Sequence, residues 1–98
     1  MKPGDLRIIA GYFPNALAAV AEHCRRSNDK HNPGSEAHWA FLKSRGHVLK
    51  AIGHLSKAGQ PDEGAPSHTI PGAWRALAAL EEELILAGAE PGALVRLT

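Results

Sequence analysis

Two histidines and an aspartate near the middle of the chain carry side chains that bind divalent metals. His54 precedes the segment "AGQPDEGAPSH" (58–68), which contains Asp62 and ends on His68. Imidazole nitrogens with carboxylate oxygens suit Mn²⁺, Zn²⁺ or Fe²⁺ better than Mg²⁺. The alternative is structural, with Asp62 capping a turn and His68 opening a helix. His54, Asp62 and His68 are therefore the candidate ligands of a predicted metal site, and spacing alone leaves the structural alternative open.

A second group of polar residues lies in "RRSNDKHNPGSEAHW", residues 25–39. Arg26 and Lys30 are suited to bind phosphates through charge-assisted hydrogen bonds. Asn28 and Asn32 serve either a turn or a ligand, and the Trp39 ring either stacks on a base or belongs to the core. Composition alone leaves both interpretations of this segment open.

Three helices are expected to position these residues, over about 14–28, 36–57 and 68–87, with a tail at 89–98. Pro14 suits a first helical turn, Ser35 is a good N-cap for the second helix, and Gly88 is a natural end for the third. The 58–68 segment breaks the chain between the second and third helices. "LRII" near the start and "ALVRLT" at the end are interpreted as short extended segments or tails.

Apolar and polar residues of the 36–57 helix are expected on opposite faces, with the apolar face in the core. The apolar face comprises Phe41, Leu42, Val48, Leu49, Ile52 and Leu55, and the polar face comprises Lys43, His47, Lys50 and His54. Gly46 and Gly53 interrupt this helix and are expected to allow the close approach of another helix.

A length of 98 residues favours a single domain, 1–98, with a modest core. The predicted fold class is all-α, a small three-helix bundle. Leu77 and Leu84 lie one heptad apart on the third helix, a spacing typical of helix–helix packing. Because so small a bundle leaves part of its apolar faces in water, we expect it to complete its core by homo-oligomerisation.

The composition, with 44% apolar and 21% charged residues and a formal net charge of +1, is that of a globular protein. Without a block of Lys and Arg, duplex nucleic acid is not an expected partner. No apolar run is long enough for a signal peptide or a membrane span, which predicts a cytoplasmic location and no membrane partner. A single cysteine excludes an internal disulfide and a Cys-based zinc site.

The segments "LRII", "FPNALAAVAEH", "RSNDKHNPG…HW", "GHL", "AGQPDEGAPSH" and "AWRALAALEEEL" occur in this order over residues 6–85. In order and spacing they resemble the phage dATP/dGTP diphosphohydrolase N-terminal type, a family discussed beside the all-α MazG-like nucleotide pyrophosphohydrolases. The resemblance marks six positions, and Glu22 stands where the first family helix often supplies an acid. The six positions are Lys30, Trp39, His54, Asp62, His68 and Trp74.

The resemblance implies that the protein cleaves a (d)NTP, a purine dNTP foremost, to (d)NMP and pyrophosphate with Mg²⁺ or Mn²⁺. Glu22, Asp62 and Glu63 are then the candidate catalytic acids. Arg26, Lys30 and Lys50 would neutralise phosphate charge, and the location would be the host cytoplasm if a phage encodes the chain. The alternative is a non-catalytic protein of the same fold that binds or sequesters a nucleotide.

Overall fold

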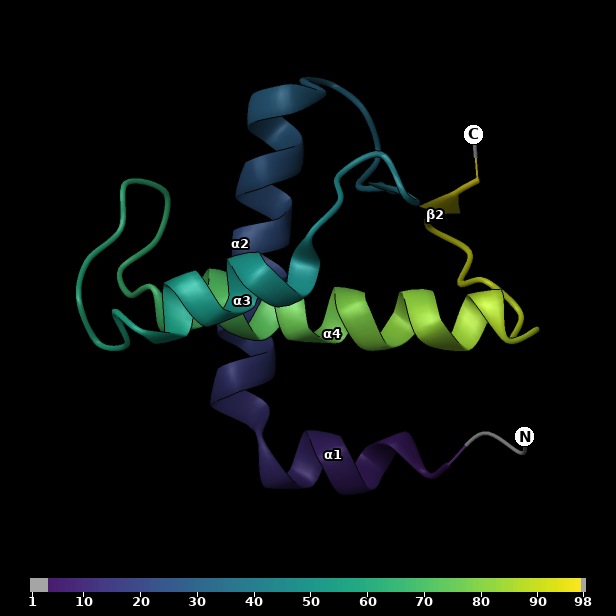
Figure 1. Ribbon diagram of the computed structural model, residues 1–98, viewed down its shortest axis with the longest axis horizontal. Coiled ribbons are helices and arrows are strands. Elements are labelled where there is room, and N and C mark those ends of the chain that lie inside the picture. Colours follow the sequence, from purple (N-terminus) through teal and green to yellow (C-terminus); the bar gives the residue numbers. More distant parts are fainter. Residues whose placement is uncertain (1–3, 98) are drawn as a thin grey trace.

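The chain forms four helices and one short parallel sheet in a computed structural model that describes residues 4–97 (Figure 1). The elements are α1 (Leu6–Tyr12), α2 (Pro14–His31), β1 (Trp39–Ala40), α3 (His47–Leu55), α4 (Thr69–Leu86) and β2 (Val95–Arg96). The prediction of a helical fold is confirmed. The last residue of the predicted tail, Thr98, lies outside the described residues. None of the helices described has the length and apolarity needed to cross a bilayer.

An antiparallel pair of helices, α3 and α4, is the centre of the fold. The start of α3 contacts the middle of α4, where His47 lies beside Trp74, and the end of α3 contacts the start of α4, where His54 meets His68. Figure 1 shows α2 crossing this pair steeply, and α2 packs on α4. Among the described elements, α1 contacts only α2. The molecule is therefore a helix pair with a crossing helix and an N-terminal arm.

Two helices follow their sequence signals closely. The predicted 14–28 helix begins at Pro14 as expected and continues to His31. The predicted 68–87 helix is α4, whose end has the hydrogen bonds of a Schellman motif. Gly88, at φ +109°, donates from its backbone N–H to the Ile85 carbonyl, and Ala89 donates to the Leu84 carbonyl. Gly88 thus ends α4 as predicted.

The start of the chain is helical rather than extended. Asp5 caps α1 because its carboxylate accepts a hydrogen bond from the backbone N–H of Arg7 at 3.0 Å. The "LRII" segment therefore forms α1, which was not predicted. At the other end, "ALVRLT" contains β2, so one of the two extended segments considered from the sequence is confirmed.

The helix predicted over 36–57 begins eleven residues too early, because α3 starts at His47. Trp39 and Phe41 instead donate their backbone N–H groups to the carbonyls of Leu94 and Arg96, at 2.9 and 2.8 Å. Leu42 at φ +63° and Gly46 at φ +74° are left-handed and cannot continue an α-helix. A pairing with residues more than fifty positions away has overridden the local helix signal.

The two faces of α3 are also reversed relative to the prediction. His47 and Ala51 are buried, and His54 is half-buried against α4. The expected core residues of this helix are at least 45% exposed: Val48, Leu49, Ile52 and Leu55. The helix therefore packs on α4 mainly through His47, Ala51 and His54, with Leu55 against Gly72 at its end, and most of its apolar face is open to solvent.

Aromatic rings join β1 to the helix pair. Trp39 makes edge contacts with Phe41, His47 and Trp74, with ring centroids 5.9–6.1 Å apart. Phe41 and His47 are buried. Edge-to-face packing of this kind contributes about 0.5–1.5 kcal/mol per pair beyond area burial. This cluster fixes the connection between α2 and α3.

His47 is held in its neutral form by its surroundings. Burial lowers its pKa most, the Arg75 charge lowers it further, and the Glu82 charge opposes both effects. Arg75 donates to His47 Nδ1 at 3.0 Å, so the ring proton is on Nε2, which lies 3.1 Å from Glu82 Oε2. Within the described part of the chain, these two buried atoms form this ion-pair contact and no hydrogen bond.

Gly72, in the first turns of α4, allows the close approach of the two helices. A Cβ atom placed there would lie 2.9 Å from Leu55 Cδ2, 3.0 Å from Leu55 Cγ and 3.3 Å from His54 Cβ. Gly53 has nothing within 4 Å of such an atom, and Gly46 is the left-handed N-cap of α3. The two glycines named from the sequence do not mediate helix contact, and Gly72 does.

Alanine substitutions at two helical glycines test this assignment. Gly53→Ala should raise the free energy of unfolding by about 1 kcal/mol, because alanine favours the helix and meets no neighbour. Gly72→Ala should lower the free energy of unfolding by about 1 kcal/mol. Overpacking against Leu55 and His54 costs about 2 kcal/mol, and the gain in helix propensity offsets only about 1 kcal/mol of that cost. Urea denaturation measures both values. Equal stabilisation by the two variants would contradict the close approach.

Candidate functional site

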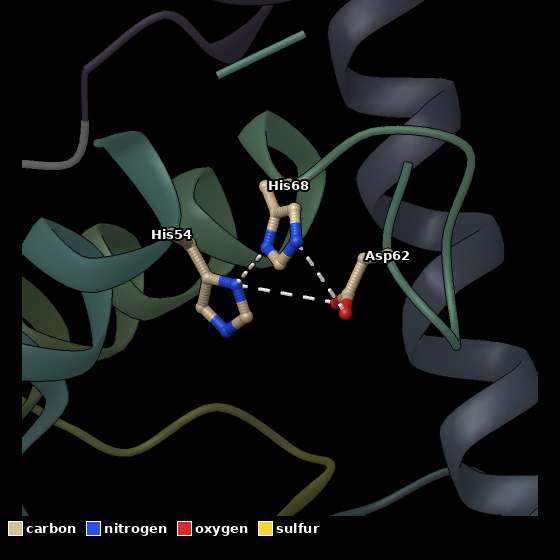
Figure 2. Close-up of side chains that lie close together, drawn as sticks. All are labelled: His54, Asp62 and His68. Carbon is tan, nitrogen blue, oxygen red and sulfur yellow. Dashed lines mark hydrogen bonds and ion pairs between the residues drawn. The ribbon is translucent and has the colours of Figure 1, made fainter. Parts of the chain in front are cut away.

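His54, Asp62 and His68 converge at the end where α3 and α4 meet, as predicted (Figure 2). His54 Nδ1 lies 2.9 Å from His68 Nδ1 and 4.0 Å from Asp62 Oδ2. His68 Nε2 lies 3.8 Å from Asp62 Oδ1. One ligand atom of each residue lies within 4.8 Å of the other two. The structure thus gathers two imidazoles and one carboxylate from three separate segments.

Backbone hydrogen bonds shape the 56–68 connection that places Asp62. Asp62 and Ala65 exchange N–H···O bonds of 3.0 and 3.4 Å, and Ala65 is buried. His68 donates its N–H to the Gln60 carbonyl at 2.9 Å. Gly59, at φ +83°, donates to the Ser67 and Thr69 hydroxyls at 3.3 and 3.2 Å. The loop is therefore ordered by its own backbone and holds the carboxylate toward the two rings.

The three side chains remain within reach of solvent. Their exposed fractions are 27% for His54, 24% for Asp62 and 15% for His68. A small ion can therefore enter without unfolding of the loop, and water can occupy coordination positions that the protein leaves open. Partial burial with an open side is typical of a catalytic rather than a closed structural metal centre.

The spacing of the donor atoms is close to that required by one ion. Two nitrogen ligands about 2.1 Å from a metal at a tetrahedral angle lie about 3.4 Å apart. The two Nδ1 atoms are 2.9 Å apart, a hydrogen-bonding distance, and Asp62 Oδ2 is 4.0 Å from His54 Nδ1. The 3.8 Å contact of Asp62 Oδ1 is with the other ring nitrogen of His68, Nε2. One ion would use a single nitrogen of His68, and side-chain rotations would bring one ligand atom of each residue, now within 4.8 Å of one another, to bonding distance. The donor set fits a divalent transition metal.

His23 on α2 adjoins this cluster and was not assigned to it from the sequence. Its Nδ1 is buried and has no hydrogen-bond partner in the part of the chain that the structure describes. Burial is the largest cause that lowers the pKa of His23; the Asp62 charge opposes it and the His54 charge adds to it. A buried ring nitrogen without a partner is expensive, and one near a polar cluster can bond a water held there. The sequence offered one signal for His23: it lies three residues before Arg26 and therefore on the same face of the predicted helix.

Glu22 does not join the cluster. It accepts hydrogen bonds from Arg25, at 2.6 and 3.1 Å, and from Arg26 at 3.0 Å. The Arg25 hydrogen bond is the largest cause that lowers the pKa of the Glu22 carboxyl. Glu63 is exposed, and its backbone N–H bonds Asp62 Oδ1 at 2.9 Å. Asp62 is the only one of the three predicted acids in the cluster.

Asn28 and Asn32 shape the end of α2. The Asn28 side chain is buried and donates to the Ser35 carbonyl at 3.0 Å. Asn32 donates to Asn28 Oδ1 at 3.5 Å, and its backbone N–H bonds the Asn28 carbonyl at 2.7 Å. Of the two roles left open by the sequence, the structure supports the turn.

The remaining predicted substrate-binding residues are dispersed. Trp39 belongs to the aromatic cluster described above, which favours its core role over base stacking. Lys50, on α3, donates to the Ser44 hydroxyl at 3.1 Å. Lys30 is exposed near the end of α2. Arg26 contributes to a cavity of about 110 Å³ that is also lined by His23 and Gly64, so it alone adjoins the loop of the cluster.

Comparison with known proteins identified no matching family model, no similar curated protein and no similar solved structure. The resemblance to the diphosphohydrolase family therefore stays a prediction.

Thermal unfolding with Mn²⁺ tests whether the cluster binds metal. An ion at a hundred times its dissociation constant adds about 2.7 kcal/mol to the free energy of unfolding, so it should raise the melting temperature of the wild type. His54→Ala with Asp62→Ala should abolish the shift. His31→Ala with Glu90→Ala removes the same kinds of group at exposed positions and should keep it. Equal shifts in all three proteins, or none in the wild type, would exclude this site.

Proposed function

We propose that His54, Asp62 and His68 bind one divalent metal ion and that the protein uses it to hydrolyse a nucleoside triphosphate. The observation that carries the proposal is the convergence of the three ligand atoms within 4.8 Å of one another. The products would be a nucleoside monophosphate and pyrophosphate, with purine dNTPs as the first substrates to test. The reaction would take place in the cytoplasm, the host cytoplasm if the chain is phage-encoded.

The donor set supports Mn²⁺ over Mg²⁺ as the ion. Two of the three ligands are imidazoles, which Mg²⁺ binds poorly, since it prefers an oxygen shell with several waters. Zn²⁺ and Fe²⁺ suit the same ligands. When bound, such an ion would neutralise phosphate oxygens and activate a water for attack on phosphorus.

The chain supplies cations for the phosphates from one face of α2. Arg26 and Lys30 are four residues apart, so they follow one another along that face over about 6 Å, beginning one turn beyond His23. Arg26 lies against the loop that carries Asp62. A polyphosphate that starts at the cluster and extends along α2 would meet Arg26 first and Lys30 next, which supports their predicted role in phosphate binding.

A non-catalytic nucleotide-binding protein is the alternative, and the small number of acids favours it. Only one carboxylate belongs to the cluster, because the arginines engage Glu22 and Glu63 lies outside. Hydrolysis of a phosphate anhydride usually relies on several carboxylates around one or two ions. Binding needs only the cations of α2 and a metal that bridges the phosphates.

We also propose that a second copy of the chain completes the bundle. The accessible surface is 7202 Å². A folded monomer of 10.4 kDa has about 5,400 Å², so this chain exposes about 1,800 Å² more. Burial of that excess on each chain would make an interface of about 3,600 Å², within the range of obligate homodimers. Its exposed apolar residues include Leu77, half exposed on the stripe predicted to mediate self-association.

Pyrophosphate release from dATP and dGTP with Mn²⁺ tests the enzyme proposal. His68→Ala should lower kcat/KM at least about a hundredfold because it removes a ligand, and His31→Ala, which is remote from the cluster, should leave it unchanged. Lys30→Ala should weaken nucleotide binding about tenfold. Nucleotide binding without release of pyrophosphate would identify the alternative. If the protein neither binds nor hydrolyses these nucleotides, both the enzyme proposal and the binding alternative are contradicted.

A further inference from the structure

An apolar groove between α3 and α4 is left uncovered by the residues that the structure describes, 4–97. Its volume is about 330 Å³, and its lining includes three alanines and the larger residues Ile52, Leu55 and Leu80. Those three residues are 60%, 45% and 52% exposed. A stable monomer buries the apolar side of a helix pair, whereas here that side faces water. The groove is therefore a surface that another apolar element covers.

The arm formed by α1 is apolar and lacks a partner as well. Leu6, Ile9 and Phe13 recur at i, i+3 and i+7 and are 79%, 45% and 52% exposed. α1 buries none of its residues and, among the described elements, contacts only α2. Figure 1 shows it at the far end of α2, away from α3. Within one chain, the arm and the groove do not meet.

We infer that a second copy of the chain fills the groove with its α1 arm and that the exchange is reciprocal. Two-fold symmetry makes both contacts at once, so one dimer covers both apolar surfaces. Two grooves placed face to face would enclose both hollows and leave the arms in water, whereas protein interiors are close-packed. A convex helix with large side chains fits a hollow that is lined in part by small alanine side chains.

Charges at the contact agree with this arrangement. Glu83 lies at the rim of the groove, and Arg7 on α1 is 92% exposed beside the apolar face. Among residues 4–97 the Arg7 side chain bonds only the neighbouring Asp5, at 2.9 and 3.1 Å. Opposite charges at the rim of an interface fix its register and speed association more than they add affinity. Arg7 of one copy would meet Glu83 of the other.

The inference rests on the proposed self-association, and a cross-linking experiment separates the two. Ile9→Cys and Ile52→Cys are made in separate full-length chains, each with Cys24→Ser. The Ile52→Cys chain is grown with heavy nitrogen, and the mixed sample is treated with a short bismaleimide. Sedimentation of wild type should give a dimer, and mass spectrometry should find light and heavy chains linked between positions 9 and 52.

The other outcomes are distinct. A wild-type monomer would overturn self-association and the exchange together. A dimer linked only between two copies of position 52 would retain self-association and overturn the exchange of arms. Charge reversal gives a second readout that does not depend on a cross-link. Glu83→Arg should weaken the dimer at least tenfold, and Arg7→Glu should restore it. Glu63→Arg, at an exposed residue that does not line the groove, should have no effect. Failure of the restoration would contradict the register.

Discussion

The close approach of α3 and α4 at Gly72 is the constraint on which the rest of the structure depends. Without a Cβ there, the first turns of α4 lie against Leu55 and His54. This contact sets the separation of the helix ends, and so brings the Nδ1 atoms of His54 and His68 to 2.9 Å from each other. The loop between the helices then has only to fold back on itself, through Asp62 and Ala65, for the carboxylate to complete the group.

The same packing explains why the apolar surface is on the outside. α3 meets α4 through His47, Ala51 and His54, because small and planar side chains permit helices to approach closely. His47 is accommodated as a neutral ring between Arg75 and Glu82. The long aliphatic residues Val48, Ile52 and Leu55 lie at the edge of this contact, where they line the groove between α3 and α4 and remain largely exposed. The candidate metal site and the proposed dimer surface are thus two faces of one helix pair.

The sequence was informative wherever structure is decided locally. Pro14 and Gly88 mark helix ends by backbone geometry, and the "AGQPDEGAPSH" loop joins antiparallel helices, so convergence of His54, Asp62 and His68 was predictable. The sequence was uninformative where contacts with residues far apart in the chain decide the local structure. The pairing of β1 with β2 replaced a helix signal after Ser35, and the apolar periodicity of α3 did not reveal which face would meet α4. His23 was missed because only tertiary packing brings it to Asp62.

The central claim is that two particular imidazoles of the six bind a metal, and nuclear magnetic resonance of the ring nitrogens tests it most directly. Zn²⁺ suits the measurement because it is diamagnetic and takes the same ligands. One equivalent added to ¹⁵N-labelled protein should shift one ring nitrogen each of His54 and His68, while His31 and His38 stay unchanged. Uniform small shifts of all six rings, or shifts that spare His54 and His68, would contradict the account.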